Sequence, residues 1–205
     1  MFITFEGGEG SGKTSIIKLV EAELIKLNHQ VLVTREPGGS LVAEQIRKII
    51  LDSKNISMTA ETEALLFAAS RTQHLEEIVL PALKDGKIVL CDRYVDSSLA
   101  YQAYARDLGF DFVLKANNYA IKNLPDITFY LDVEPELGLK RISVRNNLNR
   151  LDKEKLSFHK KVREGYHEVM KMYPERVVKI DANGTIDEML QDIMKVLGEK
   201  LWKKL

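Results

Sequence analysis

The sequence predicts an α/β domain in which five parallel strands form a central sheet with helices on both faces. Short, nearly continuous apolar runs alternate along the chain with longer segments whose apolar residues recur at helical spacing. Strands buried on both faces have this composition, and strand–helix alternation gives parallel strands joined by right-handed crossovers. A length of 205 residues and a hydrophobic content of 45% suit one domain, residues 1–205, with an ample core.

The elements of the first half follow from these patterns in chain order. We expect strand Phe2–Glu6, helix Lys13–Leu27, strand Val31–Arg35, helices Leu41–Leu51 and Thr59–Leu83, and strand Lys87–Asp92. Thr59 can cap its helix, where Glu61 and Glu63 lie near the positive end of the helix dipole. Cys91, the only cysteine, is most simply a small buried side chain, and no internal disulfide can form.

The elements of the second half complete the alternation. We expect helices Ser97–Arg106 and Phe112–Lys122, strand Ile127–Asp132, helices Pro135–Val144 and Lys153–Met172, strand Arg176–Ile180 and helix Ile186–Trp202. Pro135 suits a first helical turn, and Thr185–Glu188 fits a capping box. The apolar stripe of the last helix is interpreted as core.

The segment Gly7–Thr14 reads GGEGSGKT, which matches the P-loop motif. A strand precedes it and a helix follows, so a chance glycine-rich turn is disfavoured and a three-layer P-loop NTPase fold is predicted. Its backbone N–H groups and the helix dipole can hold phosphate oxygens. Lys13 supplies a charge for the terminal phosphates, and the Thr14 hydroxyl can ligate Mg²⁺. The ATP-binding residues predicted here are Gly7, Gly8, Glu9, Gly10, Ser11, Gly12, Lys13 and Thr14.

The composition disfavours several classes of partner. Thirty basic residues balance thirty acidic ones, so no basic excess indicates nucleic-acid binding. No apolar run approaches the ~20 residues of a membrane span, and the N-terminus leads directly into the first strand. We therefore expect a cytoplasmic enzyme without a membrane or nucleic-acid partner.

Polar residues at the carboxyl ends of the strands are the candidates for chemistry, because ligands bind there in parallel sheets. Asp92 closes a strand where a second acidic ligand for Mg²⁺ is needed. Arg93 follows it and offers a planar fork to a phosphate, although a structural Asp–Arg pair is the alternative. Glu36, in the turn Arg35–Gly39, lies where a further substrate ligand would be, but the segment can also be only a turn.

Two pairs of residues at helical spacing could read a base. Phe67 and Arg71 are four residues apart, as are Ser98 and Gln102, with Tyr101 beside them. An aromatic ring can stack on a base, and an amide can pair with a pyrimidine edge. By spacing alone, a core phenylalanine with a surface arginine is the simpler interpretation of the first pair.

A polar break at Asn146–Asn149 is flanked by Arg141, Arg145 and Arg150, which suggests a short mobile lid over approximately residues 141–152. Such a lid could close on the transferring phosphoryl group and neutralise its charge. A solvated basic loop is the alternative.

Three stretches, Thr34–Gly39, Glu63–Arg71 and Asp92–Gln102, together resemble those of the thymidylate kinase family, and the likeness covers nearly the whole chain. The resemblance implies transfer of the γ-phosphoryl group of ATP to dTMP with Mg²⁺, in the service of dTTP and DNA precursor synthesis. The lid arginines, with none in the P-loop, resemble the bacterial subtype. The family is commonly homodimeric.

The resemblance also implies residue roles. Phe67 would stack on thymine, and the residues reading its edge would be Arg71, Ser98 and Gln102. Tyr101 would crowd the 2′ position of the sugar, and Glu9 would meet its 3′-hydroxyl. The dTMP phosphate would lie against Arg93, with Glu36, Pro37 and Arg47 nearby. Arg141 would lie against adenine, and the γ-phosphate would be met by Arg145 or Arg150, of which we favour Arg150. The predicted catalytic residues are thus Lys13, Arg93, Arg145 and Arg150.

Two rival functions fit parts of the sequence. A deoxynucleoside kinase would need a carboxylate base for its neutral hydroxyl acceptor, and Glu36 could serve. Arg93 and Arg47 instead suit an acceptor that already carries a phosphate. A nonenzymatic nucleotide switch would leave the base-reading residues unexplained.

Overall fold

The computed structural model of the protein describes residues 1–144 and 148–202, the side chains of 201 and 202 excepted. Its centre is a five-stranded sheet in the order β2-β3-β1-β4-β5, in which every pairing is parallel. The strands are β1 (Phe2–Glu6), β2 (Val31–Arg35), β3 (Ile88–Asp92), β4 (Ile127–Asp132) and β5 (Val177–Asp181). The predicted α/β class with a five-stranded parallel sheet is confirmed.

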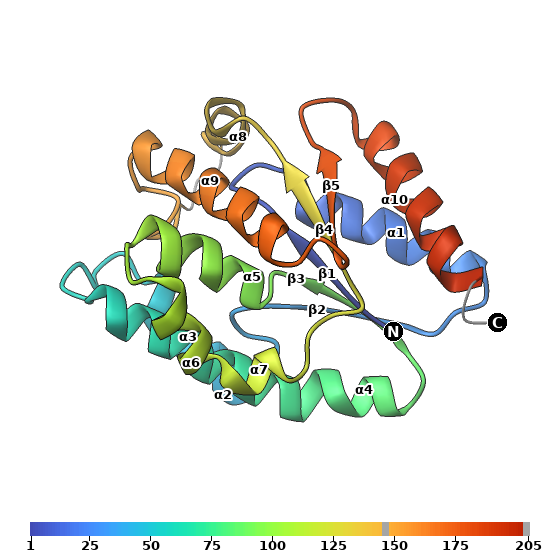
Figure 1. Cartoon of the computed structure of the whole chain (residues 1–205), viewed down its shortest axis with the longest axis horizontal. Helices are drawn as coiled ribbons and strands as arrows, with labels where there is room; N and C mark the ends of the chain where they lie inside the picture. Colours follow the sequence, from blue (N-terminus) through green and yellow to red (C-terminus); the bar gives the residue numbers. More distant parts are fainter. Residues whose placement is uncertain (145–147, 203–205) are drawn as a thin grey trace.

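Two helices cover one face of the sheet, as Figure 1 shows. These are α1 (Lys13–Lys26) and α10 (Ile186–Trp202), packed against each other and the strands. Ile3, Phe5 and Leu90 point into this layer and are fully buried. Phe2, Val89 and Cys91 alternate with them and point into the opposite layer, because successive side chains of a strand face opposite sides.

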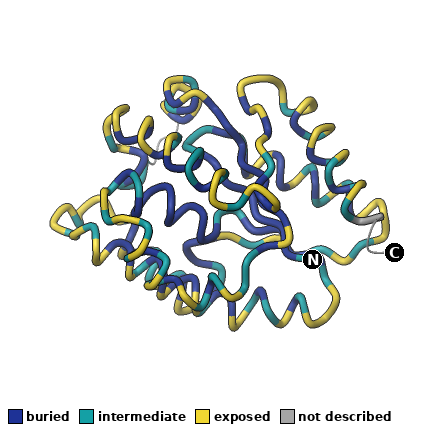
Figure 2. The backbone as a smooth tube through the Cα atoms, in the orientation of Figure 1, coloured by how far each residue is buried: buried dark blue, intermediate teal, exposed yellow. Residues whose placement is uncertain are grey.

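The other helices lie on the opposite face and at the carboxyl ends of the strands (Figure 1). They are α2 (Leu41–Leu51), α3 (Ala60–His74), the π-helical η1 (Leu75–Val79), α4 (Leu80–Lys84), α5 (Val95–Ser98), the π-helical η2 (Leu99–Ala105), α6 (Phe110–Ala116), α7 (Asn118–Ile121), α8 (Pro135–Ile142) and α9 (Leu156–Met172). Figure 2 shows the buried residues concentrated along the sheet and the inner helix faces.

The predicted helices are present, but three are subdivided. The helix predicted over Thr59–Leu83 contains a π-helical segment ahead of Pro81, which has no N–H to donate to the preceding turn. The helix predicted over Ser97–Arg106 starts at Val95 and continues as η2. The one predicted over Phe112–Lys122 breaks at Asn117, whose φ and ψ of −101° and 20° are not helical.

The predicted helix-capping contacts of Thr59 and of Thr185–Glu188 are confirmed. Thr59 Oγ1 accepts from the Thr62 N–H at 3.2 Å. The capping box closes in both directions, because Thr185 N–H donates to Glu188 Oε2 at 2.8 Å and Glu188 N–H donates to Thr185 Oγ1 at 3.3 Å. Across the described part of the chain, no helix combines the length and apolarity that crossing a membrane requires.

Candidate active site

The P-loop wraps around the side chain of its own lysine. Gly10 has a φ of 71° and packs so closely on α8 that an added Cβ would lie 2.1 Å from the Gly138 carbonyl oxygen. Lys13 Nζ donates to the carbonyls of Gly7 and Gly8 at 2.9 and 3.1 Å. Burial, reinforced by Arg93, lowers the pKa of Lys13 to about 8. The loop therefore presents a buried amine at the N-terminus of α1, where phosphate oxygens are favoured.

A cavity of about 250 Å³ opens beside this loop. Its lining joins segments far apart in sequence: the P-loop, the ends of β2 and β3, and helices α2, α3 and η2. The predicted site residues on its wall are Glu9, Gly10, Ser11, Gly12, Lys13, Thr14, Glu36, Pro37, Arg47, Phe67, Asp92, Arg93, Tyr101 and Gln102. Gly7, Gly8, Arg71, Ser98, Arg141 and Arg150 are not part of its lining.

Thr14 and Asp92, the predicted metal ligands, meet on the cavity wall. The Thr14 hydroxyl donates to Asp92 Oδ2 at 3.4 Å, from the start of α1 to the end of β3. Hydroxyl and carboxylate oxygens are donors that suit Mg²⁺, which is normally held by few protein groups together with substrate phosphates. These two side chains therefore fit the predicted ion.

Glu9, Arg93 and Tyr101 form a charged cluster on the cavity wall. Arg93 Nη2 donates to Glu9 Oε1 at 2.8 Å, and the Tyr101 hydroxyl donates to the same oxygen at 2.9 Å. Burial alone would raise the pKa of Glu9, but Arg93 and Lys13 outweigh it and lower the value to about 2. Arg93 has a φ of 71°, a conformation that costs a residue with a side chain ~1–2 kcal/mol. The contacts with Glu9 and the Gly7 carbonyl hold its guanidinium there.

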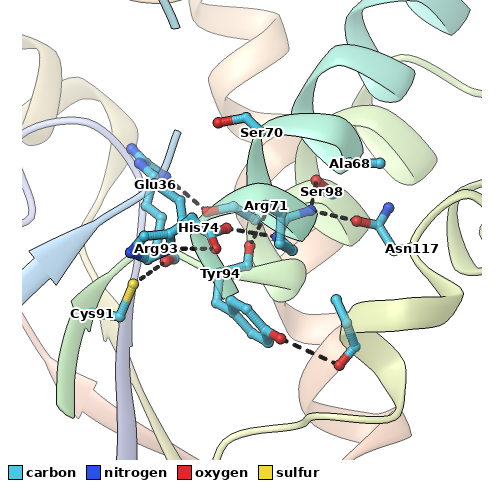
Figure 3. A network of polar contacts seen from close by, with 12 residues as sticks. Glu36, Ala68, Ser70, Arg71, His74, Cys91, Arg93, Tyr94, Ser98 and Asn117 are labelled. Atoms are coloured by element: carbon cyan, nitrogen blue, oxygen red, sulfur yellow. Dashed lines mark hydrogen bonds and ion pairs between the residues drawn. The ribbon is translucent and has the colours of Figure 1, made fainter. Parts of the chain in front are cut away.

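Arg71 lies beneath the cavity in a buried polar network drawn in Figure 3. Its Nε donates to Glu36 Oε2 at 2.6 Å, its Nη1 to Ser98 Oγ and Asn117 Oδ1, and its Nη2 to the Tyr94 carbonyl. An arginine has five N–H donors, so the four contacts leave one on Nη2. That single donor is what Arg71 can offer to a ligand without breaking a bond.

The network extends from Arg71 to residues that sequence reasoning missed. His74 Nδ1 lies 3.0 Å from Glu36 Oε1, and its Nε2 lies 2.7 Å from Thr34 Oγ1. An added Cβ on Gly39 would meet His74 Cδ2 at 2.5 Å, so the histidine braces the whole Thr34–Gly39 turn. The helical spacing of His74 after Arg71 was a usable signal, whereas nothing in the sequence linked Asn117 to this site.

Glu6, a polar residue at a strand end to which sequence reasoning assigned no role, is the last residue of β1. It accepts from the Tyr94 N–H at 2.6 Å, the Ser97 hydroxyl at 2.5 Å and the Tyr166 hydroxyl at 2.9 Å. Burial, with the charge of Asp96, raises the pKa of Glu6 to about 7. This carboxyl fixes the chain that follows β3, which carries Arg93.

Two of the candidate base-reading residues line the cavity, Phe67 from α3 and Gln102 from η2. Phe67 presents its ring and is 8% exposed. Gln102 lines the same wall, and its Nε2 donates to Glu63 Oε1 at 2.8 Å. Ser98 instead accepts from Arg71. The lining thus offers one stacking surface and one amide, whereas Arg71 and Ser98 are not part of it.

The described lid arginines lie apart from each other. Arg141 donates to the carbonyls of Gly10 and Ala182 at 3.2 and 2.9 Å, which places it against the P-loop. Arg150 donates to the Ile50 carbonyl and pairs with Glu63. Arg145, the other predicted γ-phosphate contact, lies outside the described residues.

Comparison with known proteins relates this site to one enzyme family. The model of the family described as thymidylate kinase matches residues 5–193. A thymidylate kinase of Clostridium novyi (strain NT) is 55% identical over 195 residues, covering 94% of this chain and 95% of the relative. One of Acholeplasma laidlawii (strain PG-8A) is 54% identical over 204 residues, covering 98% and 100%. The crystal structure of thymidylate kinase from Ehrlichia chaffeensis superposes with a TM-score of 0.79 at 33% identity, covering 96% of this chain and 98% of that one.

Proposed function

The chain belongs to the thymidylate kinase family, and on this premise we propose how its residues act. It is an ATP-dependent nucleoside monophosphate kinase that phosphorylates dTMP to dTDP. The observation that carries the assignment of roles is the single cavity that joins Lys13 and Thr14 to Phe67 and Gln102. Arg93 is part of the same lining.

The reaction forms one bond from a dTMP phosphate oxygen to the γ-phosphorus and breaks the bond from that phosphorus to the β,γ-bridging oxygen of ATP. No general base is needed, because a phosphomonoester has its second pKa near ~6 and is largely dianionic at neutral pH. The site must instead bring two anions together in line. Lys13 and Arg93 supply fixed positive charge for the oxygens of the transferring group.

Within this scheme Thr14 and Asp92 would hold Mg²⁺. Bound there with the ATP phosphates, the ion would offset charge that develops on their oxygens. Glu36, Pro37 and Arg47 would surround the dTMP phosphate with Arg93. Arg47 has one contact that supports this: its Nη1 donates to the Pro37 carbonyl at 2.6 Å, which aims it at the turn.

The remaining residues would contact the base, the sugar, the adenine and the γ-phosphate. Phe67 would stack on thymine, while Gln102 and the spare Nη2 hydrogen of Arg71 would read its edge. Ser98 would act by positioning Arg71. Tyr101 and Glu9 would meet the sugar, and Arg141 would lie against adenine beside the P-loop. Residues 141–152 would form the lid, from which Arg145 or Arg150 would reach the γ-phosphate.

A coupled assay of ADP release over nucleosides and nucleoside monophosphates tests the function. We expect turnover with dTMP and none with thymidine. Turnover with thymidine would identify a deoxynucleoside kinase using Glu36 as base, a role that the 2.6 Å ion pair of Glu36 with Arg71 disfavours. Silence with every acceptor would favour a nucleotide switch.

We further propose that the protein is a cytoplasmic homodimer of single-domain subunits. Large apolar side chains are exposed on α2 and α3, at Leu41, Val42, Ile49 and Leu65, and burying them against a second copy would remove apolar surface from water. Sedimentation equilibrium tests this: a monomer at micromolar concentration would contradict it.

A further inference from the structure

Glu63 is buried on α3 and contacts three side chains from two other segments. Its carboxylate is 2% exposed. Oε1 accepts from Gln102 Nε2 at 2.8 Å. Arg106 approaches both carboxylate oxygens at 3.4 Å, and Arg150 forms an ion pair with Oε2. A single buried group on α3 thus holds η2, through the cavity-lining amide of Gln102, and the residues before α9.

These contacts determine which way round the Gln102 amide lies. A carboxylate beside two guanidinium groups has only acceptor oxygens to offer, whereas an amide carries a donor nitrogen and an acceptor oxygen. Only Nε2 can therefore face Glu63. The reverse orientation would set two acceptor oxygens against each other in a buried place and lose a hydrogen bond. With one Nε2 hydrogen held by Glu63, the order of the Gln102 oxygen and second hydrogen on this wall residue is fixed.

We propose that Glu63 is a positioning residue that selects the pyrimidine by fixing the Gln102 amide; this rests on the proposed role of Gln102 in reading the base. Thymine and uracil present an N3–H donor next to the O4 acceptor. Cytosine presents an N3 acceptor next to the N4 amino donor, which is the reverse order. An amide fixed in the orientation that pairs with thymine would set donor against donor and acceptor against acceptor with cytosine. An amide that is free to rotate by 180° could pair with either base.

The test compares dissociation constants of dTMP, dUMP and dCMP, measured by calorimetry, in wild type and Glu63→Gln. A glutamine at position 63 can accept or donate, so the Gln102 amide is released. We expect the dCMP/dTMP ratio of dissociation constants to fall at least ~10-fold, about the worth of one net hydrogen bond, and the dUMP/dTMP ratio to stay within twofold. Uracil has the same N3–H and O4 groups as thymine. A change in the dUMP/dTMP ratio would therefore report a general loosening of the pocket and not a change in the Gln102 amide.

Glu154→Gln is the matched control, because Glu154 pairs with Arg106 at 2.6 Å but has no contact with Gln102 among the described interactions. It should leave all three constants near wild type. An unchanged dCMP/dTMP ratio in Glu63→Gln overturns the proposal, as does an equal change in the dUMP ratio. The Gln102→Ala variant distinguishes failure of the base-reading role of Gln102 from failure of the positioning role of Glu63. If this variant binds dTMP as tightly as wild type, the role of Gln102 is wrong.

If the Glu63→Gln variant does not fold, a measurement on the wild-type protein tests the proposal instead. In the dTMP complex, a through-hydrogen-bond NMR coupling should join Gln102 Nε2 to the carboxyl carbon of Glu63. The Gln102 signals are assigned by their loss in Gln102→Ala. Detection of this coupling supports the proposal, and its absence while neighbouring hydrogen-bond couplings are seen overturns it.

Discussion

We expect phosphoryl transfer to depend strongly on Lys13. Its amine is buried among loop carbonyls and aimed at the cavity. We predict that Lys13→Ala lowers kcat by roughly 10²–10³, since one preorganised charge contact is worth ~3–4 kcal/mol in a transition state. Steady-state kinetics with dTMP measures this, and circular dichroism checks that the fold is kept. More than a tenth of wild-type kcat would show that this amine does not serve the reaction.

Glu6 should make stability depend on pH. Burial, then the charge of Asp96, raises its folded pKa to about 7 from the 4.5 of an ordinary glutamate side chain. The native state thus binds more protons than the unfolded state between these values, and the contribution of Glu6 to stability is full below pH 4.5 and lost as the pH rises through 7. We predict that the free energy of unfolding of wild type, relative to Glu6→Gln, falls by at most ~1.4 kcal/mol per pH unit across this window. Urea unfolding at several pH values measures it, and a difference that is flat or rises with pH would contradict the assignment.

At the scale of elements, the P-loop and α8 are fitted to each other through glycine. Gly10 has a φ of 71°, and its missing Cβ leaves room for the Gly138 carbonyl. We predict that Gly10→Ala displaces the loop, weakens ATP binding at least tenfold and lowers the melting temperature. Gly86→Ala is the comparison, since it also has positive φ but no atom within 4 Å of an added Cβ. Equal ATP affinity in the two variants would show that the close approach is unimportant.

The lid prediction separates two arginines. We predict that Arg150→Ala lowers kcat and kcat/KM together, as expected for a contact made in the transition state, and that Arg145→Ala mainly raises the KM for ATP. For Arg150 to reach the γ-phosphate, its ion pair with Glu63 must open on closure. The opposite pattern reverses the two roles. If neither variant changes, the segment is not a catalytic lid.

The elements were more predictable than the contacts between them. The apolar runs and cap residues identified all five strands, because burial and local hydrogen bonding act within a few residues. The break at Asn117 was missed, since Phe112–Lys122 keeps a helical pattern throughout. Asn117 has a long-range contact that such a pattern does not reveal, because its Oδ1 accepts from Arg71 at 2.5 Å across 46 positions.

At the scale of the whole molecule, the parallel sheet brings the ends of β1, β2 and β3 to one edge, where the P-loop, Glu36 and Arg93 surround one cavity. Motifs at strand ends could therefore be placed from sequence. The supporting roles of Glu6, Glu63 and His74 could not be predicted, because these roles exist only through partners far along the chain. Arg71 looked like a surface residue by spacing and is 1% exposed.

The central claim is that this cavity transfers the γ-phosphoryl group of ATP to dTMP. Phosphorus NMR of an equimolar mixture of ATP, dTMP and Mg²⁺ with catalytic enzyme follows both substrates and both products directly. We predict that ATP and dTMP signals fall together while ADP and dTDP rise in equal amounts, with no inorganic phosphate. Release of inorganic phosphate with an unchanged dTMP signal, or transfer to thymidine when it replaces dTMP, would contradict the claim.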